Sequence, residues 1–302
     1  MDGKKILIVG SSNTDMVIKT QTFPAPGETI LGGKFLMNAG GKGANQAVAA
    51  ARTGGQVTFV GKIGNDIFGK QAVQQLNDEG INVDFVSVDD ENPSGVALIT
   101  VDRKGENSIV VAPGSNGTLS ASDFDKAMAV LDESEYILMQ LEIPISTVEH
   151  IATIAAAKRK KVVLNPAPAA KLSDELLKSI SIITPNETEA ELLTGIKVTD
   201  EQSALKAATL LHEKGIETVI ITMGAAGAFL LAEGKHEIIG APKVEPVDTT
   251  AAGDTFNGAL VVALSEGKTI HESIAFANKV AAISVTRIGA QASVPYRKEI
   301  LN

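Results

Sequence analysis

The chain contains no cysteine among its 302 residues. This absence excludes disulfides, thiol nucleophiles and cysteine-ligated zinc or iron–sulfur centres. The four histidines are scattered along the chain, and neither an H-E-x-x-H nor a G-x-S-x-G motif is present. The sequence therefore gives little support to a metal hydrolase or to a serine-triad enzyme.

The sequence also lacks a long apolar run at its start, where only residues 6–9 form one. A run of this length is too short for a signal peptide or a membrane span. We therefore expect a cytoplasmic protein that makes no contact with a membrane.

Basic residues are outnumbered, since Lys and Arg together number 27 and Asp and Glu number 36, which gives a net charge of −9. Such an acidic chain is a poor candidate for binding nucleic acid or an anionic membrane. Small anionic ligands stay possible, because backbone N–H groups can bind them.

Short apolar runs alternate with amphipathic stretches along most of the chain, and its length fits one large domain or two smaller ones. We expect strands at 5–9, 57–60, 136–139, 161–165, 182–184 and 218–222. We expect helices at 44–52, 67–79, 147–159, 187–193, 201–214, 253–266 and 270–285. This rhythm predicts an α/β protein whose mostly parallel sheet is covered by helices on both faces.

Two segments break this rhythm. Residues 15–37 contain two prolines and three glycines, and residues 94–112 read as a hairpin. Together they could form a small separate β-sheet that acts as a lid. Alternatively, they could be edge strands of the main sheet.

The most informative motif is "DTTAAGDTFNGAL" at 248–260, a loop of small residues that enters an apolar helix. The N–H groups of residues 251–254 would lie unshielded at a helix N-terminus, where the helix dipole favours an anion such as phosphate. Asp254 could then accept the proton of a hydroxyl that attacks this phosphate, which suits phosphoryl transfer. The alternative is an ordinary acidic residue that stabilises the first helical turn.

The second motif is "NAGGKGANQAVAAARTGG" at 38–55. It is not a Walker A loop, because Lys42 is followed by Gly43. Gly41, Lys42 and Asn45 could bind a polyhydroxylated substrate, or the glycines could only let the helix pack closely on the sheet.

Other candidate residues directly follow predicted strands, where open α/β sheets bind their ligands. Asn13, Asp15 and Glu142 could bind sugar hydroxyls, although turn chemistry or a solvated acid explains them as well. Asn186 and Glu189 share one helical face and could order water around Mg²⁺, or form a helix cap. The "TMGAAG" loop at 222–227 could line a nucleotide or be a hairpin turn.

Taken together, these motifs resemble the ribokinase branch of the PfkB family of sugar kinases. "GGKGAN" at 40–45 matches the N-terminal signature of this family and "DTTAAGDTFNGA" at 248–259 its C-terminal one. The similarity extends to "SSNTD", "TPNETE" and "VTRIGAQASVP". Ala251 stands where the broader family often has glycine, which favours the ribokinase branch.

The resemblance implies a ribokinase-like three-layer α/β fold with a small β-sheet lid that often forms a dimer contact. The large domain would comprise residues 1–12, 40–93 and 113–302, and the lid residues 13–39 and 94–112. The implied reaction is transfer of the ATP γ-phosphate to the 5-hydroxyl of D-ribose, with Asp254 as the base and the amides of Ala251, Ala252, Gly253 and Asp254 as the anion hole.

The resemblance also implies binding residues. Those for the sugar are Asn13, Thr14, Asp15, Gly41, Lys42, Gly43, Ala44, Asn45, Glu142 and Asp254. Those for ATP are Asn186, Thr222, Met223, Gly224, Ala225, Ala226, Gly227, Gly253, Asp254 and Asn278. Mg²⁺ would lie near Asn186 and Glu189 through water. A K⁺ ion would lie beside Asp248, Thr250, Ser284, Arg287, Gly289 and Ser293, several of which would contribute carbonyl oxygens.

Two other functions stay open on the sequence. The anion hole and the base do not specify the acceptor, so another sugar or a nucleoside could take the phosphate. A non-catalytic sugar-binding regulator could share the fold, but it would have no use for a base at Asp254.

Overall fold

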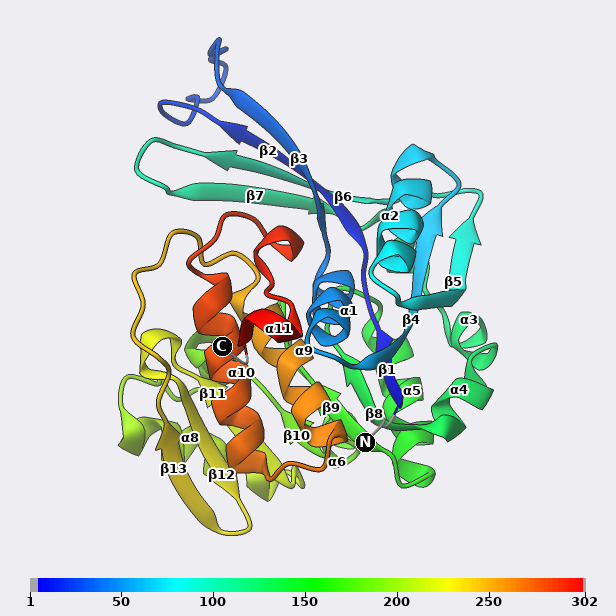
Figure 1. Cartoon of the computed structure of the whole chain (residues 1–302), viewed down its shortest axis with the longest axis vertical. Coiled ribbons are helices and arrows are strands. Elements are labelled where there is room, and N and C mark those ends of the chain that lie inside the picture. Colours follow the sequence, from blue (N-terminus) through cyan, green and yellow to red (C-terminus); the bar gives the residue numbers. More distant parts are fainter. Residues whose placement is uncertain (1–4, 301–302) are drawn as a thin grey trace.

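The computed structural model describes residues 5–300, and its main feature is a sheet of nine strands in the order β13-β12-β11-β10-β9-β8-β1-β4-β5 (Figure 1). The strands are β1 (Lys5–Val9), β4 (Gln56–Gly64), β5 (Asn82–Asp89), β8 (Ser134–Met139), β9 (Lys161–Leu164), β10 (Ile182–Ile183), β11 (Thr218–Thr222), β12 (Ala228–Ala232) and β13 (Lys235–Ile239). From β11 through to β5 in this order, neighbouring strands pair in parallel. Strand β12 pairs antiparallel with both β11 and β13.

Helices cover both faces of this sheet, which gives three layers. Successive residues of β1 point to opposite faces, so Leu7 and Val9 join one apolar core and Ile6 and Ile8 the other. The first core includes α3 (Ala121–Asp125), α4 (Met128–Glu133), α5 (Ile145–Ala157), α6 (Asp174–Lys178), α7 (Glu187–Thr194) and α8 (Glu201–Glu213). The second includes α1 (Lys42–Arg52), α2 (Ile67–Asp78), α9 (Ala252–Ser265), α10 (Ile270–Ser284) and α11 (Arg297–Ile300).

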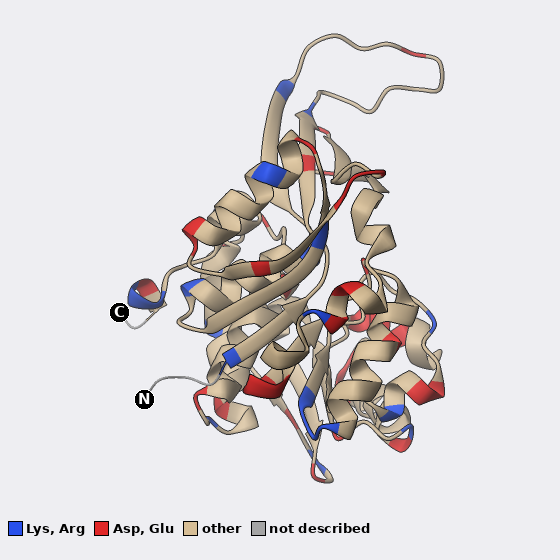
Figure 2. Cartoon of the chain, turned by 90° about the vertical axis from the view of Figure 1, so that its right-hand side faces the viewer, with Lys and Arg blue, Asp and Glu red and all other residues tan. Residues whose placement is uncertain are grey.

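The two irregular segments form a second, separate sheet of four strands in the order β3-β2-β6-β7. These strands are β3 (Lys34–Gly40), β2 (Asn13–Lys19), β6 (Gly95–Val101) and β7 (Asn107–Ala112). The alternative that they extend the main sheet is therefore wrong. Figure 2 shows that the loop joining β2 to β3 extends beyond the rest of the chain.

The predicted fold class is confirmed, and each predicted strand and helix is present with ends that shift by a few residues. The sequence pattern did not predict β5 or the place of β12 and β13 in the main sheet. The β12–β13 hairpin adds to the sheet without a crossover helix, so the alternating rhythm does not reveal it. In residues 5–300, no helix is both long and apolar enough to cross a membrane.

Candidate active site

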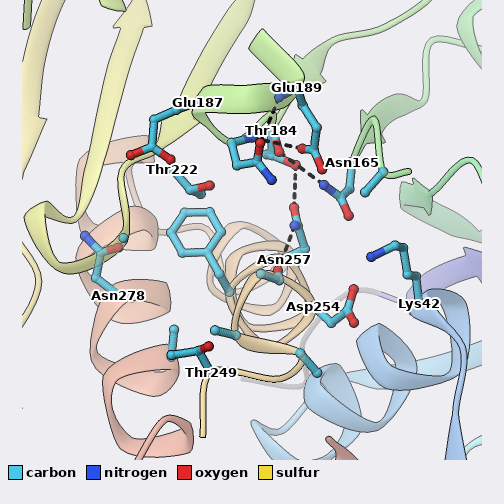
Figure 3. A pocket seen from close by; sticks show the side chains of 18 of the residues that line it. Lys42, Asn165, Thr184, Glu187, Glu189, Thr222, Thr249, Asp254, Asn257 and Asn278 are labelled. Carbon is cyan, nitrogen blue, oxygen red and sulfur yellow. Dashed lines mark hydrogen bonds between the residues drawn. The ribbon is translucent and has the colours of Figure 1, made fainter. Parts of the chain in front are cut away.

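A pocket of about 360 Å³ opens beyond the carboxyl ends of β9, β10 and β11, opposite the N-terminus of α9 (Figure 3). It brings together the residues of both signature motifs, because Lys42 lines it from α1 and Asp254 from α9. Figure 3 shows the Lys42 ammonium and the Asp254 carboxylate directed toward the same part of the pocket.

The turn that begins α9 has an unusual backbone. Ala251 adopts the left-handed conformation with φ 57° and ψ 19°, which favours glycine, and it caps the helix. Ala251 and the next three residues all line the pocket, and a Cβ atom built on Gly253 meets no atom within 4 Å. The first-turn N–H groups of Gly253 and Asp254 have no intrahelical acceptor and are available to a ligand. The N–H of Ala252 differs from our expectation, since it donates to the Thr249 carbonyl at 3.2 Å.

Asp254 is buried, with 6% of its surface exposed, and side-chain amides hold both of its oxygens. Asn45 Nδ2 donates to Oδ2 at 3.0 Å, and Gln46 Nε2 donates to Oδ1 at 2.9 Å. Burial raises the pKa of Asp254, and although Lys42 and the two amides oppose this effect, the pKa stays above its ordinary value. The site therefore holds a carboxylate that takes up a proton more readily than an exposed one.

The glycine-rich start of α1 packs tightly on the end of β1, as the packing interpretation predicts. A Cβ on Gly43 would lie 2.6 Å from the carbonyl carbon of Gly10, and Ala44 is buried in the core. Gly41 has φ +88°, and a Cβ there would lie 2.7 Å from the Asn13 nitrogen. These contacts leave Lys42 as the side chain from this turn that reaches the pocket.

A cluster of carboxylates surrounds Lys42. Glu142 accepts from the Lys42 N–H at 3.0 Å and from the Ser11 hydroxyl at 2.5 Å. Burial lowers the pKa of the Lys42 ammonium, but Asp254 and Glu142 outweigh burial and leave the pKa above its ordinary value. Lys42 therefore stays protonated at neutral pH.

The start of β2 brings Asp15 to this cluster. Burial, with help from Glu142 and Asp254, raises the pKa of Asp15 to about 6. Asn13 is buried, and its Oδ1 accepts from Asn116 Nδ2 at 2.8 Å. Thr14 lies between them on the strand and must face the opposite side, where it lines a small hollow against α2. Asn13 also lines this hollow, so of these three residues it is Asp15 that is charge-coupled to the carboxylates around Lys42.

Asn186 and Glu189 form the helix cap that was the alternative interpretation. The Glu189 N–H donates to Asn186 Oδ1 at 2.8 Å, and the Asn186 N–H donates to Glu189 Oε2 at 2.9 Å. Both residues also line the pocket, and the cap does not use Glu189 Oε1. Within residues 5–300, no three His, Asp or Glu side chains come together as metal ligands. A Mg²⁺ ion at Glu189 would thus fit as one held through water and nucleotide phosphates.

The 222–227 loop is a hairpin turn between β11 and β12, and it also lines the pocket, where a nucleotide contact stays a prediction. Thr222, Gly224 and Gly227 face the pocket together with Asn278 from α10. Met223 packs against the core instead. Ala225 and Ala226 are exposed and lie outside the pocket lining.

The residues predicted to hold K⁺ bring two loops together beside the α9 turn. The Asp248 carboxylate accepts from the N–H groups of Thr250 and Gly289, each at 2.9 Å. The Ser284 and Ser293 hydroxyls donate to carbonyls of their own turns. Arg287 pairs with Glu299 at 2.8 Å, so a cation would contact its carbonyl rather than its side chain. A carboxylate together with backbone carbonyls would offer a cation oxygen ligands only.

The sequence analysis missed a group of buried amides behind Asp254. Gln46, Asn165 and Asn257 are each at most 7% exposed. Gln46 donates to Asp254 and to Asn165, and Asn257 donates to the Gly253 carbonyl in the α9 turn. Gln46 directly follows Asn45, and Asn257 lies inside the C-terminal motif. Their place in the motifs was therefore the available signal, but their partners come from distant parts of the chain.

An α/β sheet whose pocket combines first-turn amides with a buried carboxylate defines an enzyme that transfers a phosphoryl group to a small molecule. The sequence pattern of the pfkB family carbohydrate kinases matches residues 3–297, and the chain belongs to this family.

Individual relatives cover nearly the whole chain. A ribokinase of Haemophilus influenzae is 52% identical over 99% of this chain and 97% of its own. A ribokinase of Staphylococcus aureus is 40% identical over 98% of each. The structure of an Arabidopsis thaliana ribokinase complexed with ribose and ATP has a TM-score of 0.92 at 34% identity, with 99% of this chain and 98% of that chain covered.

Proposed function

We propose that this protein transfers the γ-phosphate of ATP to the 5-hydroxyl of D-ribose, giving D-ribose 5-phosphate. The family and the ribokinase relatives support this reaction. The mechanism rests on one observation at the start of α9. The buried Asp254 carboxylate there directly follows Gly253, whose N–H group has no acceptor within the helix.

Asp254 is the general base, which takes the proton of the sugar hydroxyl as the phosphoryl group moves. The N–H groups of the α9 turn stabilise the negative charge on the phosphoryl oxygens. The sugar lies between β2 and α1, bound by Asn13, Asp15, Gly41, Lys42, Asn45 and Glu142. The nucleotide lies in the pocket, bound by Asn186, Thr222, Gly224, Gly227, Gly253 and Asn278.

Two ions complete the proposal. Mg²⁺, when bound near Glu189 through water, would neutralise charge on the ATP phosphates. K⁺, when bound between the Asp248 loop and the residue 284–293 segment, would favour the arrangement of the α9 turn. The residues described above fit both ions.

The experiment that tests the proposal is ATP consumption across a panel of pentoses, hexoses and nucleosides, with and without K⁺ and with Mg²⁺ removed by a chelator. We expect D-ribose to give the highest kcat/KM, K⁺ to raise the rate, and chelation to abolish it. A higher kcat/KM with another sugar or a nucleoside would show that this compound, and not D-ribose, is the preferred acceptor. The proposed kinase chemistry would still hold. No ATP consumption with any acceptor would favour the sugar-binding regulator.

We further propose that the small sheet is a lid and a contact between two copies of the chain. Its cross-strand register puts Met37, Met16, Leu98 and Val110 in one row on the same face. Three of these side chains are about half exposed or more, namely Met37 at 48%, Leu98 at 56% and Val110 at 66%. An exposed apolar face of this kind is typical of a protein interface.

Light scattering should give a mass about twice the 31.4 kDa of one chain. We expect Leu98→Lys to lower this mass toward that of a single chain, because the new charge would be buried in the contact. A monomeric mass for the unaltered chain at working concentration would remove the dimer proposal.

A further inference from the structure

The two amides that hold Asp254 have different surroundings. Asn45 contacts the half-buried side chain of Gln291, whose Nε2 donates to Asn45 Oδ1 at 3.2 Å. Gln46 is completely buried, does not line the pocket, and lies between α9 and the main sheet. Gln46 therefore reaches the reaction only through the groups to which it is bonded.

The Gln46 amide fits its site in one orientation. Its NH₂ group donates to two acceptors, Asp254 Oδ1 at 2.9 Å and Asn165 Oδ1 at 3.0 Å. Its carbonyl oxygen accepts from Gln140 Nε2 at 2.5 Å. A flipped amide would direct its oxygen at the oxygens of Asp254 and Asn165 and its NH₂ at the NH₂ of Gln140. Each of these contacts would be repulsive.

The bonds continue from Gln46 and return to the α9 turn. Asn165 Nδ2 donates to the Thr184 carbonyl at 3.2 Å, which fixes its own orientation. The Thr184 hydroxyl donates to Asn257 Oδ1 at 2.6 Å, and Asn257 Nδ2 donates to the Gly253 carbonyl at 2.8 Å. A series of hydrogen bonds thus joins the carboxylate of the base, through Gln46, to the peptide that presents the phosphate-binding amides. Figure 3 shows the part of this series from Asn165 through Thr184 to Asn257.

Gln140 orients the Gln46 amide from the side away from Asp254. It is completely buried, and its Oε1 has no hydrogen-bond partner among residues 5–300. A buried acceptor without a partner is unfavourable, and an apolar residue of similar size would avoid it. Gly10 lies against this oxygen, since a Cβ there would come within 2.1 Å of it. The chain thus leaves one end of this amide unsatisfied while the other end holds Gln46.

We propose that Gln46, oriented by Gln140, is a positioning residue that fixes the Asp254 carboxylate in its reactive place and in its anionic form. This inference rests on the proposed function, because it acts through Asp254 as the base. The bond to Oδ1, with that of Asn45 to Oδ2, sets the plane of the carboxylate. The hydrogen bonds through Asn165 and Asn257 hold the carboxylate in a fixed position relative to the α9 turn.

The charged groups around Asp254 define the pH dependence to be measured. Lys42 faces it from α1 and favours the anion, whereas Asp15, Glu142 and Glu189 face the same cluster and oppose it. Loss of the Gln46 donor removes a bond made to the anion, which raises the pKa of Asp254. Because kcat/KM falls as Asp254 becomes protonated, the acidic limb of the pH profile should move to higher pH.

The test is Gln46→Met, which keeps the length of the side chain and removes the donor. We expect kcat for ribose to fall about tenfold, less than the ~10²-fold low end for loss of the base itself. The KM values should change by less than about twofold, because the residue does not touch either substrate. The acidic limb should move to higher pH. Gln202→Met on the exposed face of α8 is the control and should leave all of these values unchanged.

If Gln46→Met does not fold, the double variant Gln46→Met with Gln140→Met is used instead. It removes both partners of one hydrogen bond, so the Gln140 NH₂ group is not left buried without an acceptor. The decisive measurement repeats the change in an Asp254→Asn background, where it should have no further effect on kcat. An unchanged kcat and acidic limb in the folded variant would overturn the inference, and so would an equal fractional loss in both backgrounds. Full turnover by Asp254→Asn alone would instead overturn the base assigned in the proposed function.

Discussion

Asp254→Asn is expected to lower kcat at least ~10²-fold, the low end for loss of a general base. Ribose binding should stay intact. Asparagine has almost the same shape as aspartate but cannot take the proton of the attacking hydroxyl. This position is buried, so the variant side chain stays beside the substrate. Its oxygen keeps one of the bonds from Asn45 and Gln46, and its NH₂ group replaces the acceptor of the other. Calorimetric ribose binding and steady-state turnover of the same preparation measure the two effects separately.

The pH dependence of kcat/KM is a second measurement on this variant. In the unaltered enzyme, Asp254 has a raised pKa and must be ionised to act, so kcat/KM falls as the pH is lowered through that pKa. The residual activity of Asp254→Asn should lack this limb. Asp15, whose pKa is raised to about 6, remains in the variant, but loss of the Asp254 charge lowers its pKa, so any limb that Asp15 contributes should move to lower pH. Wild-type-like turnover by Asp254→Asn would end the proposed mechanism.

The sequence predicted the fold well where its elements are regular. β1 and β11 begin and end at the predicted residues, because each is a short apolar run of the kind buried on both faces of a parallel sheet. The short helices α3, α4 and α6 were not predicted, since five or six residues are too few to show a helical period. For the lid, the pattern alone left two arrangements open, because strand pairing depends on contacts between segments far apart in the sequence.

The site could be predicted as a set of residue types and motifs, but its geometry could not. Asn45 and Gln46 are neighbours, yet both reach Asp254 because α1 packs closely on α9, where a Cβ on Gly258 would lie 2.6 Å from that of Ala49. Thr14 belonged to a motif but faces away, because a strand alternates its side chains. The Ala252 N–H is used by a local turn that small residues do not specify.

Gly253→Ala is expected to separate folding from catalysis at the start of α9. Gly253 lies in the first helical turn without positive φ, and a Cβ there meets nothing within 4 Å. Alanine is the better helix former, by roughly 0.5–1 kcal/mol, so the free energy of unfolding in urea should stay level or rise.

The same methyl group would stand in open pocket space above the amides that are proposed to receive the γ-phosphate. Alanine keeps the N–H, but its methyl group would hinder the approach of the phosphoryl oxygens. Loss of one such contact typically costs ~10²–10³-fold in kcat, and we expect an effect of about 10²-fold here. Gly117→Ala, an exposed glycine outside the pocket whose Cβ would make ordinary contacts of 3.6 Å, is the matched control and should keep full activity. Activity near wild type in Gly253→Ala would mean that the phosphoryl group does not approach this turn. Retained stability with lost activity would show that glycine is kept at this position for the ligand and at some expense to the helix.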